Sequence, residues 1–525
     1  MRGKKWFILL ASLALVLLAN SLGATRSSFV DPESSTGNTF QAWASRQWTQ
    51  TTQDDFNAGL LNGVDTSSSP GDVKLATKTN WYNTNWQYRR AITIDHTKVQ
   101  DVANPSTTYA NFPVLVYATG LSNIKANGAD IRFTSSDGIT ELPREIERYS
   151  GGILYAWVKV TLTKDAGDSS NDVIYMYYGN AAAIEPAPGS TYGSQNVWNS
   201  NYKGVWHLRE TSGGAGAIKD STSNVNHGTD SGSPTFGAAG KIGNCINFDG
   251  TDDYIAVPSS ASLKLGSGLT IEAWINIDVW GNWMDIVFKG GGDANNSDYQ
   301  FALVTESGGG LAWDGTYAGN WRTKYFNTSQ NTGTWIYVVV THNTTTVKCY
   351  RAGSEISSQA DAGAIHESDY QLAISQEGAA SRGWLDGKID EIRISNIARS
   401  ADWIKTCYNN QNSPSTFCSV GGEEGLYVSS GIIASQVWDT GVPGARWDGL
   451  FWNEIVPSGT DITFKVRASD TLSGGFPDAP WVPVGGTSPV TSGLPSGRYM
   501  QWQATLTTSD TSKTPTLQEV RVYHY

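Results

Sequence analysis

Carboxylate side chains are the groups of this chain that could carry out hydrolytic chemistry. One run of them, Asp-Gly-Lys-Ile-Asp-Glu at 386–391, opens a predicted strand. Hydrolysis of a glycosidic bond with retention needs two carboxyl groups about 5 Å apart on one side of a cleft. Asp390 and Glu391 are adjacent, and adjacent side chains of a strand point to opposite faces. We therefore expect this pair not to share a substrate, and we predict no catalytic residues.

Histidine-based and nucleotide chemistry are not indicated either. The six histidines are far apart in the sequence and none lies in an HExxH arrangement; they are His96, His207, His227, His342, His366 and His524. The sequence has no Gly-x-Ser-x-Gly elbow, no phosphate-binding Gly-Lys-Ser/Thr loop and no dinucleotide fingerprint. These motif absences argue against the common hydrolases, nucleotide-binding proteins and dehydrogenases.

Asp390 has a second possible role. It has the parity of Ile392 and Ile394, which places it on the side of the strand that faces the predicted core. An ionised carboxylate on that side is costly unless it is paired or hydrogen-bonded. The position of Asp390 therefore predicts either a bound metal ion or several backbone N–H donors beside its carboxylate. The sequence does not decide between these two alternatives.

Aromatic residues indicate a ligand-binding surface. Five of them fall in Gly-, Asn- and Asp-rich segments where strands are expected to turn: Trp280, Trp283, Trp313, Tyr317 and Trp321. Exposed rings stack on the C–H faces of sugars, while nearby polar side chains bond the hydroxyl groups. We predict a carbohydrate-binding surface; the alternative is that several of these rings pack into the edge of the fold.

The elements that must position these residues are strands. Apolar and polar residues alternate at 269–278, and a more continuously apolar strand is expected at 336–341. The chain holds 21 Trp, 23 Tyr and 56 Gly with only 37 Lys and Arg, a balance that favours β-sandwiches over helical bundles. We predict an all-β fold of three tandem sandwiches or jelly rolls, with Ser400 capping a short helix from Ala401 to about 409.

The block at 196–420 resembles the laminin-G-like, concanavalin A-like jelly roll of secreted lectins and surface proteins. The resemblance rests on the opening Gly-Val-Trp-His-Leu at 204–208 and the closing Leu-Asp-Gly-Lys-Ile-Asp-Glu-Ile-Arg-Ile at 385–394. It implies a structural calcium held by Asp220, Asn226 and Asp390. The alternative is that Asp220 caps a turn and Asp390 accepts backbone N–H bonds.

Four cysteines are present, and an exported chain could pair them: Cys245, Cys349, Cys407 and Cys418. Four cysteines allow three connectivities. We favour 245–349, which would staple the laminin-G-like block, and 407–418, which closes a short loop. Free buried thiols are the alternative.

The preceding segment, 80–183, predicts a separate sandwich. Short strands are expected near 90–95, 112–116, 130–133, 154–160 and 173–178. The segment resembles a domain of unknown function found in secreted prokaryotic proteins, often directly before a laminin-G-like domain. The resemblance rests on Trp-Gln-Tyr-Arg-Arg at 86–90, Gly-Ala-Asp-Ile-Arg-Phe at 128–133 and Tyr-Met-Tyr-Tyr-Gly-Asn at 175–180. The resemblance implies which domains accompany this one in a chain, and it implies no activity.

The two ends of the chain either form separate segments or fold together into one domain. Residues 424–525 predict a third sandwich, because 462–468 and 500–506 each alternate apolar and polar residues. Residues 25–79 are polar and predict no core of their own. They are either a stalk or a strand donor to 424–525, with 71–75 as the leading strand and the middle domains inserted between.

The first residues predict export. Arg2, Lys4 and Lys5 precede an apolar run at 6–19, which is too short to cross a membrane comfortably and typical of a secretory signal peptide at 1–24. An uncleaved anchor is the alternative. A net charge of −12 with no basic cluster beyond these residues argues against nucleic acid as a partner.

Together these patterns predict a secreted or cell-surface, adhesin-like protein without catalysis. It would recognise a glycan or an extracellular protein through the laminin-G-like block. The alternatives are a spacer subunit of an extracellular assembly and a polysaccharide-cleaving glycoside hydrolase.

Overall fold

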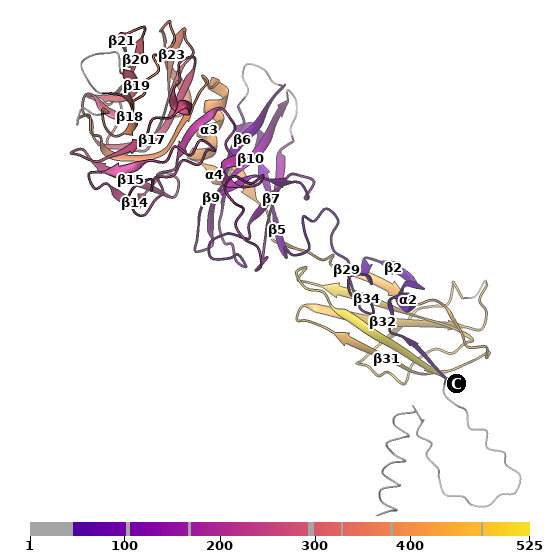
Figure 1. Cartoon of the computed structure of the whole chain (residues 1–525). Coiled ribbons are helices and arrows are strands. Elements are labelled where there is room, and N and C mark those ends of the chain that lie inside the picture. The colour runs from indigo at the N-terminus through magenta and orange to yellow at the C-terminus, as the bar shows by residue number, and fades with distance from the viewer. Residues whose placement is uncertain are drawn as a thin grey trace, which may run out of the picture. The chain divides into compact units, whose positions relative to one another are not determined.

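The computed structural model describes residues 46–100, 106–165, 170–291, 299–326, 329–378, 382–473 and 476–525 (Figure 1). The predicted signal peptide at 1–24 lies outside them. The described chain forms two compact units, one built from 46–79 with 425–525 and the other from 80–424. Both are built almost entirely of strands, so the all-β prediction is confirmed. None of the described helices is long and apolar enough to cross a membrane.

The unit that joins the two ends of the chain has two sheets. In the first, β35 (Thr516–His524) pairs with β1 (Arg46–Gln50), β4 (Val73–Leu75) and β31 (Trp447–Ile455), and β4 pairs with β3 (Val64–Asp65). The second has the order β2 (Leu60–Asn62), β29 (Ser430–Ala434), β34 (Tyr499–Thr508), β32 (Thr460–Ser469) and β33 (Val482–Val484), with β30 (Trp438–Asp439) on β34. A short helix, α2 (Gln53–Asn57), lies between β1 and β2.

N-terminal strands belong to both sheets of this unit. β1 and β4 pair with β35, and β2 pairs with β29. Trp48, Phe56, Val73 and Leu75 are buried in one core with Trp502 and its neighbours. The strand hydrogen bonds that the strand-donor hypothesis requires are therefore present, and 46–79 is not a separate stalk.

The other unit begins with the sandwich expected at 80–183. Its first sheet has the order β6 (Ser106–Ala118), β10 (Ile153–Asp165), β9 (Arg144–Ser150). Its second runs β27 (Cys418–Val420), β5 (Tyr88–Ile94), β11 (Asp172–Tyr178), β7 (Arg132–Thr134), β8 (Glu141–Leu142). Single 3-10 turns, η1 (His96–Lys98) and η2 (Ser194–Asn196), lie in its connections. β27 shows that residues after the jelly roll return to complete this sandwich.

The jelly roll packs two sheets face to face around a core of Ile, Leu, Val and Phe side chains. One sheet runs β14 (Thr235–Ala239), β15 (Asn244–Asp249), β26 (Asp386–Ser395), β17 (Leu269–Val279), β22 (Ile336–His342), β23 (Thr346–Arg351), β24 (Ser354–Ala360), with β12 (Tyr202–Trp206) on β26. The other runs β13 (Thr229–Ser231), β16 (Tyr254–Val257), β25 (Leu372–Ile374), β18 (Met284–Gly290), β19 (Tyr299–Glu306), β20 (Gly310–Tyr317), β21 (Asn320–Phe326), and η3 (Ala261–Leu263) connects β16 to β17.

The sandwich and the jelly roll share a second core. Trp274 on β17 and Tyr337 on β22 point out of the jelly roll and are buried in one cluster with Leu115 and Trp157 of the sandwich. The helix α3 (Ala401–Asn412) adds Trp403 to the same cluster, and α4 (Pro414–Phe417) follows it. Ser400 accepts a hydrogen bond from the Trp403 amide, which confirms the predicted cap, although the helix continues to Asn412.

The predicted disulfides are not formed, and all four cysteines are buried free thiols. Cys245 lies on β15 and Cys349 on β23, and three strands separate β15 from β23 in the sheet. Four strand spacings amount to about 19 Å, whereas a disulfide joins Cα atoms about 4.4–6.8 Å apart. Cys407 lies on α3 and Cys418 on β27, each among side chains of the shared core.

Candidate functional site

A cleft of about 570 Å³ opens on the outer face of the jelly-roll sheet that contains β18 to β21. Its walls combine three tryptophan rings with charged and amide side chains, the pairing of apolar area and polar groups typical of ligand sites. The lining residues are Asn282, Trp283, Met284, Asp285, Val304, Asp314, Trp321, Glu377, Arg382, Gly383 and Trp384.

The strand register explains how these side chains reach the same face. Val304 on β19 lies opposite Asp285 on β18, and Ala302, two residues along β19, lies opposite Asp314 on β20. Apolar side chains of this face form a cluster with Trp321, separate from the core between the sheets: Phe288, Ala302, Val304 and Ala312. Period-2 alternation in β19 and β20 sends Leu303 and Trp313 inward and leaves Asp314 at the cleft, whereas a bulge in β18 after Asp285 turns both Ile286 and Val287 inward.

The electrostatics of the cleft are dominated by carboxyl groups. Burial raises the pKa of Asp285 well above its ordinary value, and the nearby Glu377 and Asp314 charges add to the rise, which Arg382 opposes. Arg382 forms a two-pronged ion pair with Glu377, with Nη2 at 2.7 Å from Oε1. Burial therefore favours the neutral form of Asp285, which both donates and accepts hydrogen bonds.

Gly383 fits against Asp285 because it has no side chain. Its φ is +77°, and a Cβ atom there would lie 2.2 Å from Asp285 Oδ2. The Gly383 carbonyl accepts a hydrogen bond from the Asp285 amide at 2.7 Å. This contact fixes the wall of the cleft to the start of β18.

We expect Gly383→Ala to destabilise the chain by about 1–3 kcal/mol more than Gly319→Ala, because it adds a steric clash to backbone strain. Gly319 is the matched control, with φ of +79° and no atom within 4 Å of the position that a Cβ atom would take. Thermal unfolding of the two variants measures the difference. Equal losses would show that Gly383 does not pack against Asp285.

The five predicted ligand-binding aromatics divide into two groups. Trp283 is 41% exposed and lines the cleft with Trp321. Trp313 and Tyr317 are buried at 0% and 2% exposure, in the core between the sheets, so their assignment as ligand platforms is wrong. Trp280 packs against the same core and does not line the cleft.

The predicted calcium ligands do not form one site. Strand β26 contains a bulge, because Arg393 pairs with Glu272 while Asp390 pairs with Trp274, and Glu391 between them has φ of +55°. The extra residue reverses the parity of the strand. Asp390 therefore faces away from the jelly-roll core, and its Oδ2 accepts the N–H of Ile242, in the connection between β14 and β15, at 2.9 Å.

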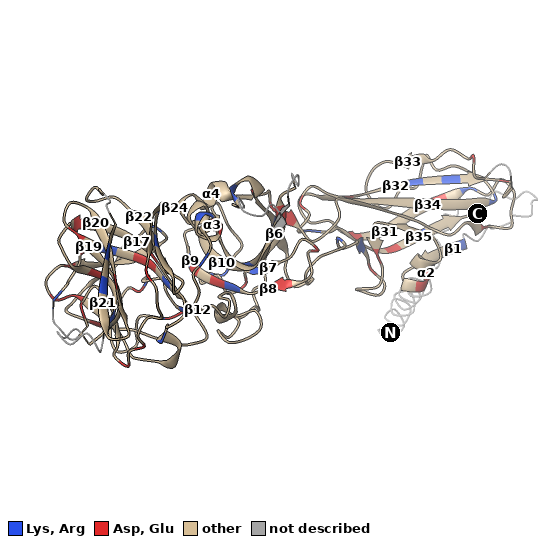
Figure 2. Ribbon diagram, turned by 90° about the horizontal axis from the view of Figure 1, so that it is seen from above, with Lys and Arg blue, Asp and Glu red and all other residues tan. Residues whose placement is uncertain are grey.

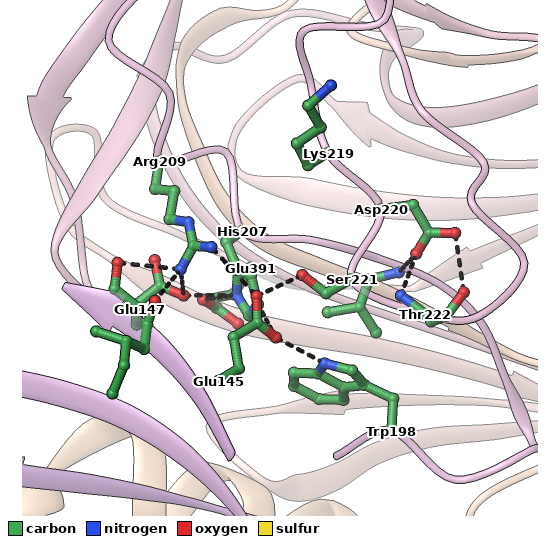
Figure 3. A network of polar contacts seen from close by, with 12 residues as sticks. Glu145, Glu147, Trp198, His207, Arg209, Lys219, Asp220, Ser221, Thr222 and Glu391 are labelled. Atoms are coloured by element: carbon green, nitrogen blue, oxygen red, sulfur yellow. Dashed lines mark hydrogen bonds and ion pairs between the residues drawn. The ribbon is translucent and has the colours of Figure 1, made fainter. Parts of the chain in front are cut away.

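Asp220 is occupied as a turn cap. It accepts hydrogen bonds from the Thr222 amide at 2.9 Å and the Thr222 hydroxyl at 2.8 Å (Figure 3). The amides of Val205 and Asn226 donate to it at 3.0 and 2.8 Å. The Asn226 side-chain amide donates to the Lys203 carbonyl at 2.7 Å. These donors satisfy the carboxylate, so the set Asp220, Asn226 and Asp390 does not fit a calcium ion.

A buried ionic network lies between the sandwich and the jelly roll (Figure 3). His207 lies among three carboxylates, with Nδ1 at 2.6 Å from Glu391 and 3.0 Å from Glu147, and Nε2 at 3.3 Å from Glu145. Arg209 contacts Glu145 and Glu147, each at 3.2 Å. Both glutamates come from β9, whose acidic and basic residues lie close together in Figure 2.

The network pairs buried cations with buried carboxyl groups. Burial alone would lower the pKa of His207, but the three carboxylates raise it well above its ordinary value. Burial alone would likewise raise the pKa of Glu145, yet the His207 charge holds it at about 2. Arg393 contributes the third cation and lies 2.6 Å from Glu391. Three cations therefore face three carboxyl groups, of which Glu147 has its pKa raised to about 7 by burial and by the neighbouring Glu391 and Glu145 charges, against the opposing Arg209 and His207 charges.

His207, Glu147 and Glu391 are close enough together to hold a metal ion. The two carboxylates, however, already contact Arg209 and Arg393, and these cations take the place of a metal charge. We interpret the network as an ionic lock between the two domains. Such locks favour one packing arrangement even where they add little net stability.

Sequence reasoning missed both the lock and the acidic part of the cleft. Glu145 and Glu147, two apart in one strand, were a signal, because two same-face carboxylates in a half-buried strand require partners. No local pattern connects them with His207, 60 residues later. Asp285, Asp314 and Glu377 come from three separate segments and carry no shared motif.

Comparison with known families confirms both resemblances. Residues 249–405 match the concanavalin A-like lectin/glucanases superfamily, and residues 127–192 match a domain of unknown function, DUF2341. No curated protein matches the chain.

Solved structures give weaker similarities. Domain 4 of AbnA, a GH43 extracellular arabinanase from Geobacillus stearothermophilus in complex with arabinotriose, is 18% identical with a TM-score of 0.32, covering 39% of this chain and 97% of that one. The receptor binding domain of botulinum neurotoxin C/D mosaic serotype is 15% identical (TM-score 0.34; 41% and 52% covered). The binding domain of Paraclostridial Mosquitocidal Protein 1 is 14% identical (TM-score 0.33; 52% and 61% covered). This chain thus spans only part of the two toxin domains, and similarities of this size support no functional conclusion.

Proposed function

We propose that this chain is an exported recognition protein that binds carbohydrate in the cleft on the jelly roll, without catalysis. The observation that carries the proposal is the exposed Trp283 ring beside Trp321 and polar side chains in a preformed cleft. The match of 249–405 to a superfamily of lectins and glucanases supports carbohydrate as the ligand class.

The chemistry of the cleft suits a sugar. Tryptophan rings offer flat apolar area for the C–H face of a pyranose or furanose ring. Asn282, Asp285 and Asp314 supply donors and acceptors at the side and floor for hydroxyl groups. Trp283 also makes an edge-to-face contact with Tyr325, with centroids 6.1 Å apart, which limits the positions that its ring can take.

We expect Trp283→Ala and Trp321→Ala each to weaken glycan binding about tenfold, the loss of about 1.4 kcal/mol that removal of one stacking ring represents. Isothermal titration with a glycan selected from an array measures the change. Tyr192→Ala is the matched control, because Tyr192 is a 38% exposed aromatic residue outside the cleft. Unchanged affinity in both tryptophan variants would contradict the proposed site.

The remainder of the molecule fits a role in presenting this cleft outside the cell. The signal-like N-terminus supports export, and the ionic lock supports a rigid connection between the sandwich and the jelly roll. In this proposal the first sandwich is a support for the jelly roll. A spacer role for the whole chain would leave the cleft without a ligand. The absence of binding both on a glycan array and in a screen of surface proteins would favour that role.

Glycan hydrolysis is a second candidate function, and one observation favours it. Asp285 has a raised pKa and lies near the Glu377 and Asp314 carboxylates, as a general acid does in glycosidases. The test is release of reducing ends from polysaccharides over hours. Our proposal expects none, whereas release that Asp285→Asn abolishes would establish the hydrolase.

A further inference from the structure

We propose that the cleft selects uncharged glycans and rejects those that carry uronic acid or sulfate groups. This inference rests on the proposed function, since it names the ligand class of the same site. It follows from the charges of the lining residues and from where they are held.

Carboxyl groups outnumber cations among the described residues of the cleft. Asp285, Asp314 and Glu377 face the cavity, and Arg382 is the lining residue of opposite sign. The Arg382 guanidinium is engaged by both oxygens of Glu377, so its charge is balanced within the wall. The floor therefore has carboxyl groups in excess.

The two floor carboxyls are held where water screens them least. Asp285 and Asp314 are buried at 2% and 1% exposure, on strands β18 and β20. Charges interact more strongly in such an environment than in bulk water. Burial and neighbouring carboxylates favour the neutral form of Asp285, and Arg382 is paired with Glu377, so an anion in the cleft would face the Asp314 carboxylate and gain no unpaired cation from these lining residues.

A neutral sugar meets none of these costs. Its hydroxyl groups donate hydrogen bonds to the carboxylates of Asp314 and Glu377, and its C–H face stacks on Trp283. The chain as a whole, with a net charge of −12, also slows the approach of polyanions at low salt.

The experiment uses the full chain and two panels of immobilised polysaccharides. The neutral panel holds glucans, mannans, galactans, xylan and arabinan, and the anionic panel holds polygalacturonate, alginate and heparan sulfate. We expect binding within the neutral panel only. Equal or tighter binding of an anionic polysaccharide overturns the charge inference, whereas binding to neither panel overturns the proposed function itself.

A matched pair of ligands isolates charge from shape. The neutral hexose polysaccharide that binds is oxidised at its C6 hydroxymethyl groups to carboxylates, and part of that product is then methyl-esterified. We expect oxidation to weaken binding about tenfold or more at low salt, a difference that salt reduces and esterification reverses. A loss that survives esterification would overturn the inference, because shape would then be the cause.

A protein variant completes the test. Glu377→Gln removes one carboxylate and releases the Arg382 charge into the cleft, so the affinity for the oxidised polysaccharide should rise relative to the neutral one. Glu355→Gln is the control, because Glu355 lies on β24 of the opposite sheet in an exposed pair with Lys348. An unchanged ratio in Glu377→Gln, or an equal rise in Glu355→Gln, would contradict the proposal.

Discussion

Replacement of His207 by alanine should destabilise the 80–424 unit by about 3–5 kcal/mol, the cost of removing one partner from a buried ion pair. His207 is 2% exposed and contacts three carboxylates, which would be left with two arginines to balance them. Glu391→Gln tests the same network from the other side, because it leaves Arg393 and His207 without their shared anion.

Calorimetry of the full chain measures this loss, because the 46–79/425–525 unit provides an internal reference. Only the transition of the 80–424 unit should shift. Lys348→Ala is the matched control: it breaks an ion pair whose side chains are each 37% exposed, and we expect a change within about 0.5 kcal/mol. A His207→Ala loss no larger than that of Lys348→Ala would refute the lock.

The lock also predicts a pH profile. The contribution of His207 is fully present below its unfolded pKa and is lost as the pH rises through its raised folded pKa. Glu145, with its pKa lowered to about 2, contributes above its unfolded value near 4.5 and loses that contribution as the pH falls between 4.5 and 2. Glu147, with its pKa raised to about 7 by burial, adds a loss of stability as the pH rises from about 4.5 to 7. The wild-type unit should therefore lose stability at both ends of the range, and His207→Ala should remove the part of the alkaline loss that His207 contributes.

Deletion of residues 46–79 should unfold the C-terminal unit completely. The segment contributes β1, β2 and β4, the buried Trp48 and Val73, and the Gln50 side chain that accepts the Trp502 indole N–H at 2.7 Å. Each large apolar side chain that leaves the core removes about 1.5–3 kcal/mol, and several together exceed the usual stability of a domain.

A second variant tests whether the deletion unfolds the C-terminal unit because it removes strands β1, β2 and β4 or because any shortening of the chain destabilises this unit. The Lys78 amide donates to the Leu426 carbonyl at 2.9 Å and the Val428 amide donates to Ala76 at 3.0 Å, so the two ends of the inserted unit leave from adjacent positions. Joining 46–79 to 425–525 through a short glycine linker should give a cooperatively folding protein, whereas 425–525 alone should show no thermal transition. A folded 425–525 fragment would contradict this account.

Local patterns predicted several of the strands. The alternation at 462–468 and 500–506 matches the half-buried strands β32 and β34. That at 269–278 matches β17, whose polar face is also buried because Trp274 packs into the core shared with the sandwich. The family resemblance identified the order of the two middle domains. The pairing of β4 with β35 was open in the sequence, since partners more than 400 residues apart leave no local trace.

The candidate site was predicted only in part. Trp283 and Trp321 line the cleft, but Trp313 and Tyr317 have the same composition around them and point inward, because a turn in the sequence does not fix which face a ring takes. The calcium set failed at two residues, because Asp220 is satisfied as a turn cap and Asp390 faces away from the jelly-roll core. The bulge at Glu391 shifts the parity of β26, and a period-2 argument cannot detect an extra residue.

The cleft is the centre of this account, and a structure of the chain with a bound oligosaccharide tests it most directly. The neutral oligosaccharide that binds most tightly on the array would be soaked into crystals at several times its Kd. We predict a sugar ring stacked on Trp283, with hydroxyl groups bonded to the carboxyls of the cleft floor. Sugar density elsewhere on the chain, with the cleft unoccupied, would contradict the account.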